Sequence, residues 1–405
     1  MTTWLSIGIL FVFAAIAFVI YRWGNIKCIG VTPVRNFTFI AILFTSGLDV
    51  GLIMFPLTEF AGYADVATSP EYAFSNPLAI EFGFWAFFIW AFYFLTCFYF
   101  CVIEPRVKFF DIPLIKFINN LIIIGTCAFT AYLLLVNLPW YMPALGDGET
   151  IIGSFYLVVF AVIAASVYSS TSIRYVRILS LGSSWLFLGL IVMMWAGAFL
   201  SDGSGVGEFF TTFGLLGDYF ANLHNFVLPI NDYHEFYLYW WFAWSIMIGQ
   251  FTARFVGGMK TYQVLASMMI FPSVPIGIWF TVLYYYSAND IPVAGISNMA
   301  MVFVGVTFVI NSLDSLVRLY TDNLNLTVQR FGKTKYIIGN VVLLSGLTLL
   351  FKLDFLQIQW VGALAIGLIL GCFGYILVSH YRKVVEIKTS PAENKIDFGK
   401  IELAN

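Results

Sequence analysis

The chain has 405 residues, of which 60% are hydrophobic and only 10% are charged. Soluble domains carry about 25% charged residues, so this composition excludes a soluble protein and indicates an integral membrane protein in contact with a lipid bilayer. A net charge of -2 without a basic patch gives no indication of nucleic acid as a partner. No nucleotide-binding or hydrolase motif occurs, and the five cysteines lack metal-ligand spacing, so we expect neither an enzyme nor a resident cofactor.

Apolar segments long enough to cross a bilayer recur along the whole chain. They number about eleven, and each is near the ~20 residues that a membrane-spanning helix needs. The first has no basic region and no cleavage site of small residues, so it is interpreted as a retained helix and not as a signal peptide. The segments lie at residues 4–22, 37–61, 80–103, 117–139, 151–171, 176–199, 236–257, 263–286, 293–318, 336–353 and 357–380.

The basic residues lie on alternate sides of these predicted spans. All but Lys352 of the 20 Lys and Arg fall on one side, in the loops after the odd-numbered spans and in the C-terminal tail. Such an excess marks the cytoplasmic side. The prediction is a multi-pass protein of the cytoplasmic (inner) membrane, with the N-terminus outside and the C-terminus in the cytoplasm.

The longest connection, residues 200–235, divides the remaining spans into five before it and five after it. Its apolar residues have mixed helical spacing with acidic residues between them, which predicts an interfacial helix on the outer surface. An odd number of spans per half forces opposite orientations, and a 5+5 inverted repeat is an architecture of secondary transporters. The expected all-α units are an extra N-terminal helix and loop (1–36), a first repeat (37–199), the linker (200–235), a second repeat (236–380) and a cytoplasmic tail (381–405).

Two clusters of aromatic residues occur at mid-depth in predicted spans, and each lies within one sector of a helix, about 100° and about 140° of arc. Facing aromatic surfaces can form a box for a quaternary ammonium group, because the ring quadrupole attracts a cation that cannot donate hydrogen bonds. The alternative is that these rings fill a core or an interfacial belt. The residues are Trp240, Trp241 and Trp244 in one span, and Trp85, Trp90 and Tyr93 in the other.

The second span is predicted to be an interrupted helix. Residues 45–56 contain two glycines, a proline and Asp49, and the backbone groups that glycine and proline free are tolerated in a membrane only at a cavity or against another helix. Burying the Asp49 carboxylate costs about 2.5–3.5 kcal/mol. Asp49 is therefore interpreted as a proton carrier, as a counter-charge for a cationic solute or as a polar cap. Glu59 and Glu81 lie near segment ends and are interpreted as interfacial.

The ninth span ends in a run of small polar residues. Asn311, Ser312 and Ser315 present the hard oxygen donors that Na⁺ prefers, by analogy with other hard cations. The alternative is that they form hydrogen bonds between helices. Asp314 lies one turn before Arg318, and a structural ion pair at the cytoplasmic end is an equal alternative for it.

Together these stretches resemble the betaine/choline/carnitine transporter family. The family patterns W-x-x-x-x-W-x-x-Y and W-W-x-x-W-S are matched by residues 85–93 and 240–245, and its downstream Ala-Arg pair by residues 253–254. Its glycine-rich unwound helix is echoed by residues 47–51, and its F-x-x-T-S-x-D-S segment by residues 308–315. The four stretches occur in the family's order across about residues 37–380.

The resemblance implies a leucine-transporter-like fold, a cation-binding box and a sodium position. It assigns the box to Trp85, Trp90, Tyr93 and Trp241, with Trp244 on the path towards the cytoplasm. The sodium position, which is the second sodium site of the family, is assigned to Phe308, Asn311, Ser312, Gly47 and Leu48. Three departures matter: Asn311 replaces the usual threonine, Asp49 stands where many sodium-coupled members have glycine, and Phe60 follows Thr58-Glu59 where the family has proline. Both H⁺ and Na⁺ therefore remain coupling ions, with H⁺ favoured by Asp49, and family analogy makes a homotrimer possible.

The sequence as a whole predicts a cation-coupled symporter that works by alternating access on a quaternary ammonium or related onium solute such as choline or betaine. A transporter of the same fold for an amino acid or another small solute, or an uncoupled exchanger, is the alternative. A channel is disfavoured because no repeated filter loop occurs. An intramembrane enzyme is disfavoured because the buried polar inventory is sparse.

Overall fold

The structure is a computed structural model that describes residues 1–47, 51–200 and 205–390. The predictions for Leu48 and Asp49 lie outside the described residues. The described chain is helical apart from its connections and two short strands, β1 (Lys27–Ile29) and β2 (Gly257–Lys260). These strands pair antiparallel, with Lys27 opposite Lys260 and Ile29 opposite Gly257. They tie the connection after the first helix to the connection after the aromatic-rich helix.

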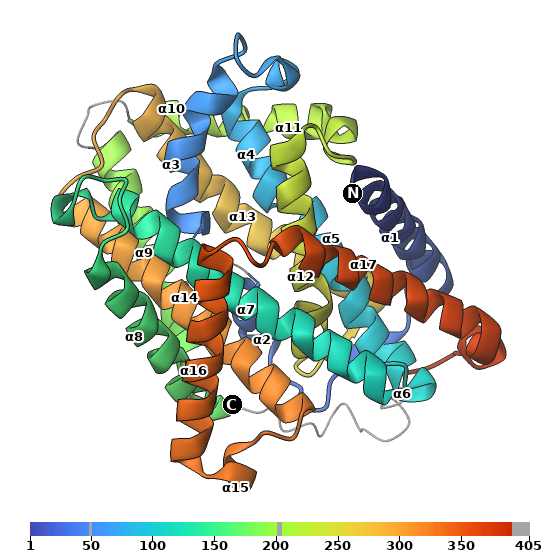
Figure 1. The fold of residues 1–405 in the computed structure, drawn as a ribbon. Coiled ribbons are helices and arrows are strands. Elements are labelled where there is room, and N and C mark those ends of the chain that lie inside the picture. The colour runs from blue at the N-terminus through green and yellow to red at the C-terminus, as the bar shows by residue number, and fades with distance from the viewer. Residues whose placement is uncertain (48–50, 201–204, 391–405) are drawn as a thin grey trace.

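Nine helices of the described chain are long and apolar enough to cross a membrane, and a bent pair makes up to ten candidate spans. The all-helical membrane fold predicted from the sequence is confirmed (Figure 1). The spans are α1 (Thr2–Trp23), α2 (Asn36–Ser46) with α3 (Gly51–Ala64), α4 (Pro77–Trp85) continuing through α5 (Phe88–Phe98), η2 (Tyr99–Ile103) and α6 (Glu104–Val107), α7 (Pro113–Tyr141), α8 (Gly153–Ser170), α9 (Ile173–Phe199), α13 (Thr261–Ala288), α14 (Ile296–Asn323), α16 (Lys333–Lys352), and α17 (Ile358–Tyr375) continuing through η5 (Ile376–His380) and α18 (Tyr381–Val385).

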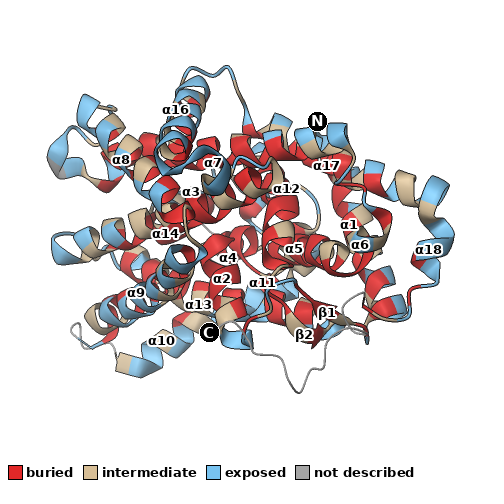
Figure 2. Cartoon of the chain, turned by 90° about the horizontal axis from the view of Figure 1, so that it is seen from below, coloured by how far each residue is buried: buried red, intermediate tan, exposed pale blue. Residues whose placement is uncertain are grey.

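The one remaining predicted span, the seventh in chain order, is α12 (Asp232–Thr252), a helix of 21 residues. It is not among the candidate spans by composition, because tyrosines and tryptophans occupy positions that aliphatic residues fill elsewhere. Buried residues cover almost its whole length and all its faces. Figure 2 shows the buried residues concentrated on α12, α5 and α4, with exposed residues on the helices at the periphery of the bundle. A helix that is apolar all round belongs in the interior of a bundle.

Short helices occupy the connections. The 200–235 connection, for which an interfacial helix is predicted, contains the short helices α10 (Gly205–Gly214) and α11 (Gly217–Ala221), followed by η4 (Leu223–Phe226). The α10 helix packs on α9 and α13, and α11 packs on α4. The other short elements are η1 (Pro70–Tyr72), η3 (Pro143–Leu145) and α15 (Val328–Phe331).

The central helices pack in two sets. The first set, which we call the inner set, contains α3, α4 with α5, α12 and α13, and the second, which we call the outer set, contains α7, α8, α14 and α16. Each set contains helices from both halves of the chain, and these helices occupy corresponding positions before and after the 200–235 linker. An inverted repeat predicts that equivalent helices of the two halves pack in the same set.

Two of the spans are interrupted. The predicted interruption lies between α2 and α3, whose axes diverge by 53°. A second, not predicted, separates α4 from α5 at Phe87, which has φ 55° and ψ -83°. A bulky residue rarely adopts a positive φ. The Phe87 N–H, which the helix no longer satisfies, donates to Ser273 Oγ of α13 over 2.9 Å, so a distant helix stabilises the break.

The close packing of α17 on α12 gives a stability prediction. A side chain at Gly362 would overlap the Tyr239 backbone carbonyl, whereas nothing lies within 4 Å of the position that a side chain would take at Gly374 on the same helix. Gly362→Ala is expected to lower stability by about 1–3 kcal/mol, the usual cost of overpacking. Thermal aggregation followed by size-exclusion chromatography measures this. Gly374→Ala is the matched control, and equal melting of the two variants would contradict the packing described.

Candidate functional site

The predicted aromatic residues of α4 and α12 meet in the interior. The Trp85 ring packs edge to face on Trp241 at 5.2 Å and on Trp240 at 5.6 Å, and Trp240 stacks on Trp241 at 5.0 Å with an interplanar angle of 9°. Tyr237 lies 5.6 Å from Trp85. All four rings are at most 1% exposed. We call Trp85, Tyr237, Trp240 and Trp241 the indole cluster.

A second aromatic pair lies beyond the α4/α5 interruption. Trp90 packs edge to face with Tyr93 at 5.3 Å, and both are fully buried on α5. Trp244, 1% exposed, lies on α12 one turn beyond Trp240 and Trp241. The structure thus joins Trp85 to Trp240 and Trp241, and Trp90 to Tyr93, with the break at Phe87 between the two groups.

The interrupted α2/α3 helix contacts both groups of rings. A Cβ atom at Gly47 would lie 3.0 Å from the Trp90 ring, and one at Gly51 would lie 2.5 Å from the Trp85 ring. Only glycine allows the backbone to approach these rings so closely. Gly47 ends α2 and Gly51 begins α3, so the facing ends of the two helices lie beside Trp90 and Trp85 respectively.

Among the described residues, most indole N–H groups of the site do not donate a hydrogen bond. Trp241 Nε1 donates to the Phe84 carbonyl over 2.8 Å. Within the described residues, the buried Nε1 atoms of Trp85, Trp90, Trp240 and Trp244 make no hydrogen bond. A buried donor without a partner costs free energy, and several of them along one interior surface mark a place where an acceptor group of a solute would fit.

The interpretation of Glu81 as interfacial is wrong. Its side chain is fully buried because α4 begins at Pro77, one turn before Glu81, and α3 covers this turn. Glu81 Oε2 accepts a hydrogen bond from the Tyr63 hydroxyl over 2.8 Å. Glu59, on the same helix as Tyr63, is partly buried and lies close enough to Glu81 for the two carboxyl groups to interact.

Asn231, the N-cap of α12, connects this region to the loop between α3 and α4. Its side-chain amide donates to Glu71 Oε1 over 2.7 Å and to the Tyr72 hydroxyl over 2.8 Å. The hydrogen bond from Asn231 lowers the pKa of Glu71, and burial raises the pKa of Tyr72 to about 12. Tyr72 packs on Tyr63 at 5.0 Å, so the loop is held over the end of the helix pair that carries Glu81.

Three of the predicted ion-site residues, Phe308, Asn311 and Ser312, lie on α14 and face two different helices. Phe308 packs on Phe44 of α2 at 5.9 Å. Ser312 Oγ donates to the Thr45 carbonyl of α2 over 3.4 Å, whereas Asn311 Oδ1 accepts from Ser180 Oγ of α9 over 3.0 Å. Ser312 is thus beside the end of the interrupted helix, and Asn311 is turned away from it.

The predicted ion pair between Asp314 and Arg318 is wrong. Asp314 is fully buried and accepts from Ser169 Oγ of α8 over 2.5 Å and from Ser315 Oγ over 3.2 Å. Ser315 in turn lies 3.2 Å from Ser46 Oγ at the end of α2. Arg318 has the same i,i+4 spacing to Asp322, and it pairs with that residue. A hydroxyl network thus links α2, α8 and α14.

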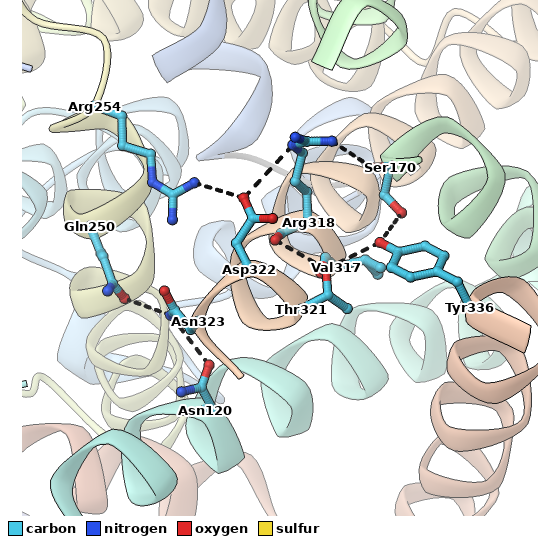
Figure 3. A network of polar contacts seen from close by, with 10 residues as sticks. All are labelled: Asn120, Ser170, Gln250, Arg254, Val317, Arg318, Thr321, Asp322, Asn323 and Tyr336. Atoms are coloured by element: carbon cyan, nitrogen blue, oxygen red, sulfur yellow. Dashed lines mark hydrogen bonds and ion pairs between the residues drawn. The ribbon is translucent and has the colours of Figure 1, made fainter. Parts of the chain in front are cut away.

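A polar network closes the end of the molecule where α12 and α14 terminate. Figure 3 shows Asp322 of α14 between Arg318 and Arg254, the second residue after α12. The distances are 3.8 Å to Arg318 and 3.1 Å to Arg254. Gln250 of α12 and Asn323 of α14 extend the network. The ion pair between Arg254 and Asp322 connects the inner set of helices to the outer set, and we call it the latch.

Metal-ligating residues do not gather in the described part of the chain: no group of three or more His, Cys, Asp or Glu side chains could hold a metal ion there. All five cysteines are buried and free. The oxygen atoms best placed for a monovalent ion are those of Thr45, Ser46, Ser312 and Ser315, where α2 ends against α14.

Comparison with known proteins gives distant relatives, and no family model matches the chain. The chain is 25% identical to the glycine betaine transporter OpuD of Bacillus subtilis over 295 residues, which are 65% of this chain and 57% of that protein. It is 29% identical over 76 residues to an uncharacterized transporter of Mycobacterium tuberculosis, 16% of this chain and 13% of that protein. The match thus spans little more than half the length of OpuD.

Among solved structures, a substrate-bound, outward-open Na⁺-coupled sialic acid symporter is similar with a TM-score of 0.49 and 16% identity, over 92% of this chain and 86% of that chain. The sequence relationship to OpuD confirms the resemblance on which the motif analysis rests. Over 65% of its length the chain is therefore a distant homologue of a glycine betaine transporter.

Proposed function

We propose that the protein is a secondary active transporter that moves a quaternary ammonium or related onium solute across the cytoplasmic membrane by alternating access. The observation that carries this proposal is the indole cluster, packed against the interrupted helix in the interior of the bundle. The distant homology to a glycine betaine transporter supports the same class of solute.

An onium headgroup needs aromatic faces because it has no proton to donate. Each ring in contact contributes about 0.5–2 kcal/mol by cation–π attraction, and more when water is excluded. Trp85 and Trp241 meet edge to face, so a headgroup would separate them, and Trp90 with Tyr93 would close the other side. The free indole N–H groups would meet the oxygen atoms of the solute.

Alternating access requires the inner and outer sets of helices to move relative to each other. The indole cluster is carried by the inner set, on α4 and α12, and the latch from Arg254 to Asp322 ties that set to α14. Every indole-cluster ring is buried, so solvent does not reach the rings in this structure. Breaking the latch would open the end of the site where α12 terminates, the side that the distribution of Lys and Arg makes cytoplasmic.

Two positions are proposed for the coupling ion. Na⁺ would bind where α2 ends against α14, with the Thr45 carbonyl and the Ser312 hydroxyl as ligands and Phe308 alongside, while Asn311 faces Ser180 of α9. A proton would be carried by Asp49, which lies outside the described residues. Under this proposal the chain is a symporter with the N-terminus outside, and a homotrimer is the assembly that family analogy suggests.

The first test is uptake of radiolabelled choline and glycine betaine into proteoliposomes. Trp241→Leu is expected to raise the KM of the preferred solute about 2- to 30-fold, since one cation–π contact contributes about 0.5–2 kcal/mol. Trp185→Leu, which removes an indole 63% exposed on the outside of α9, is the matched control and should leave KM unchanged. Failure of the unmodified protein to take up either compound would overturn the proposed function.

The coupling ion is tested with separately imposed H⁺ and Na⁺ gradients. If protons drive uptake, Asp49→Asn abolishes the accumulation of solute while exchange across the membrane persists, because the carrier of the proton is lost. If Na⁺ drives it, Ser312→Ala lowers the Na⁺ affinity and Asp49→Asn does not, because the hydroxyl is an ion ligand. Accumulation unaffected by both substitutions would contradict both assignments.

The latch gives a prediction about conformation. Asp322→Asn is expected to increase the rate at which a thiol reagent modifies a cysteine introduced at the buried Ser245 position of α12 by about two- to fivefold, because a partly exposed ion pair contributes about 1 kcal/mol or less. Modification is followed by mass spectrometry. Asp290→Asn, in the connection between α13 and α14, serves as the control, and an unchanged rate for Asp322→Asn would show that the latch does not hold the site closed.

A further inference from the structure

Glu81 is a fully buried carboxyl group whose close polar neighbours are the Tyr63 hydroxyl and the Trp85 indole. Its Oε2 atom accepts from the Tyr63 hydroxyl over 2.8 Å, while Oε1 makes no hydrogen bond within the described residues. The residue is 0% exposed. Isolated burial of a carboxylate is unfavourable unless a positive charge or further donors accompany it. The oxygen atom Oε1 is therefore available to a group that arrives from outside the protein.

The indole cluster begins one helical turn from this carboxyl group. Residues four apart lie on the same face of a helix, so Glu81 and Trp85 both face α3. The Trp85 indole lies close enough to the Glu81 carboxyl group to interact with it. Phe55 and Gly51 of α3 pack against the Trp85 ring, and Tyr63 of the same helix meets Glu81. Acid and aromatic rings thus form one continuous surface between α3, α4 and α12.

None of the described neighbours gives Glu81 a positive charge. The titratable groups that face it are Glu59 and Tyr63 from α3, Tyr72 from η1, and Tyr233 and Tyr237 from α12. The nearby His234 stacks on Phe84 at 4.4 Å, and its Nδ1 atom accepts a hydrogen bond from the Ile230 N–H over 3.2 Å, as a neutral imidazole does. The ion pairs among the described residues all involve Asp322, at the latch.

Glu59 adds a second carboxyl group to the same surface between α3, α4 and α12. It is partly buried, contacts Tyr233 and lies near Glu81. Two carboxyl groups close together repel each other when both are charged, so a cation between them or beside one of them is stabilised. The order along the surface is a partly exposed acid, a buried acid and then the indole cluster.

We infer that Glu81 is the counter-charge for the headgroup of the solute, so that this site selects onium compounds with a net positive charge over zwitterions. The inference rests on the proposed function and names its substrate class. A quaternary ammonium cation would contact the Trp85 and Trp241 faces and place its charge beside Glu81 Oε1. A betaine brings a carboxylate of its own, which Glu81 repels in a site from which water is excluded.

The test compares two solutes that share the trimethylammonium group and differ in net charge. In proteoliposomes, Glu81→Gln is expected to raise the KM for choline about tenfold or more, because it removes one partner of a buried charge pair, and to leave unchanged or lower the KM for glycine betaine. Glu81→Asp keeps the charge and should keep the preference for choline. Size-exclusion chromatography in detergent checks folding, and Glu149→Gln, on an exposed loop, is the matched control.

The result that overturns the inference is different from the result that overturns the proposed function. Unmodified protein that prefers glycine betaine, or a Glu81→Gln variant that changes both KM values by the same factor, would show that Glu81 does not distinguish the solutes. Loss of Na⁺ dependence for both solutes alike in Glu81→Gln would assign the carboxylate to an inorganic cation and likewise overturn it. Absence of uptake of both solutes by the unmodified protein would remove the proposed function itself.

Discussion

The contact between an interrupted helix and a cluster of buried indoles is the constraint on which the rest of the structure depends. Backbone groups freed inside a membrane must be satisfied by other parts of the protein. Gly47 and Gly51 allow α2 and α3 to lie against Trp90 and Trp85. The rings in turn are held by α12, whose Trp241 donates to the Phe84 carbonyl beside the second interruption. A residue of the indole cluster thus stabilises the second break, and the described ends of the first lie against two rings of the candidate site.

This arrangement also explains why the polar residues of the interior are few and concentrated. A buried carboxyl group in a membrane protein is expensive and tends to mark function. Asp314 is held by hydroxyls from α8 and α14, and its network reaches Ser46 at the end of α2. Glu81, by contrast, keeps one oxygen without a partner among the described residues. The first acid connects helices of the outer set to α2, and the second faces the region we assign to the solute.

Much of the fold could be predicted from the sequence because membrane spans have a strong length and composition signal. The two glycines and Pro56 also predicted the interruption of the second span. The break at Phe87 could not be predicted, since phenylalanine has no preference for a positive φ and the bond that satisfies its N–H comes from Ser273, far along the chain. Local spacing predicted an ion pair for Arg318 and Asp314, but Asp322 has the same spacing and is the residue that pairs.

The candidate site was predicted in part. Helical spacing placed Trp240 and Trp241 on one face, and the structure brings that face to Trp85. The burial of Glu81 was missed because the predicted span begins at residue 80, next to Glu81. The signal was present in Asn76 and Pro77, a helix cap followed by a proline at the first helical position. Read together, they start the helix one turn earlier, which puts Glu81 inside the bundle on the same face as Trp85.

The measurement that tests the central claim most directly is a structure of the protein with an arsenic-containing analogue of choline, located by anomalous scattering. The account predicts one arsenic peak within about 6 Å of the ring centroids of Trp85 and Trp241, the range of a cation–π contact, and on the side of Trp85 that faces Glu81. A peak elsewhere in the bundle, or none at a concentration that saturates uptake, would contradict the assignment of these indoles as the solute site.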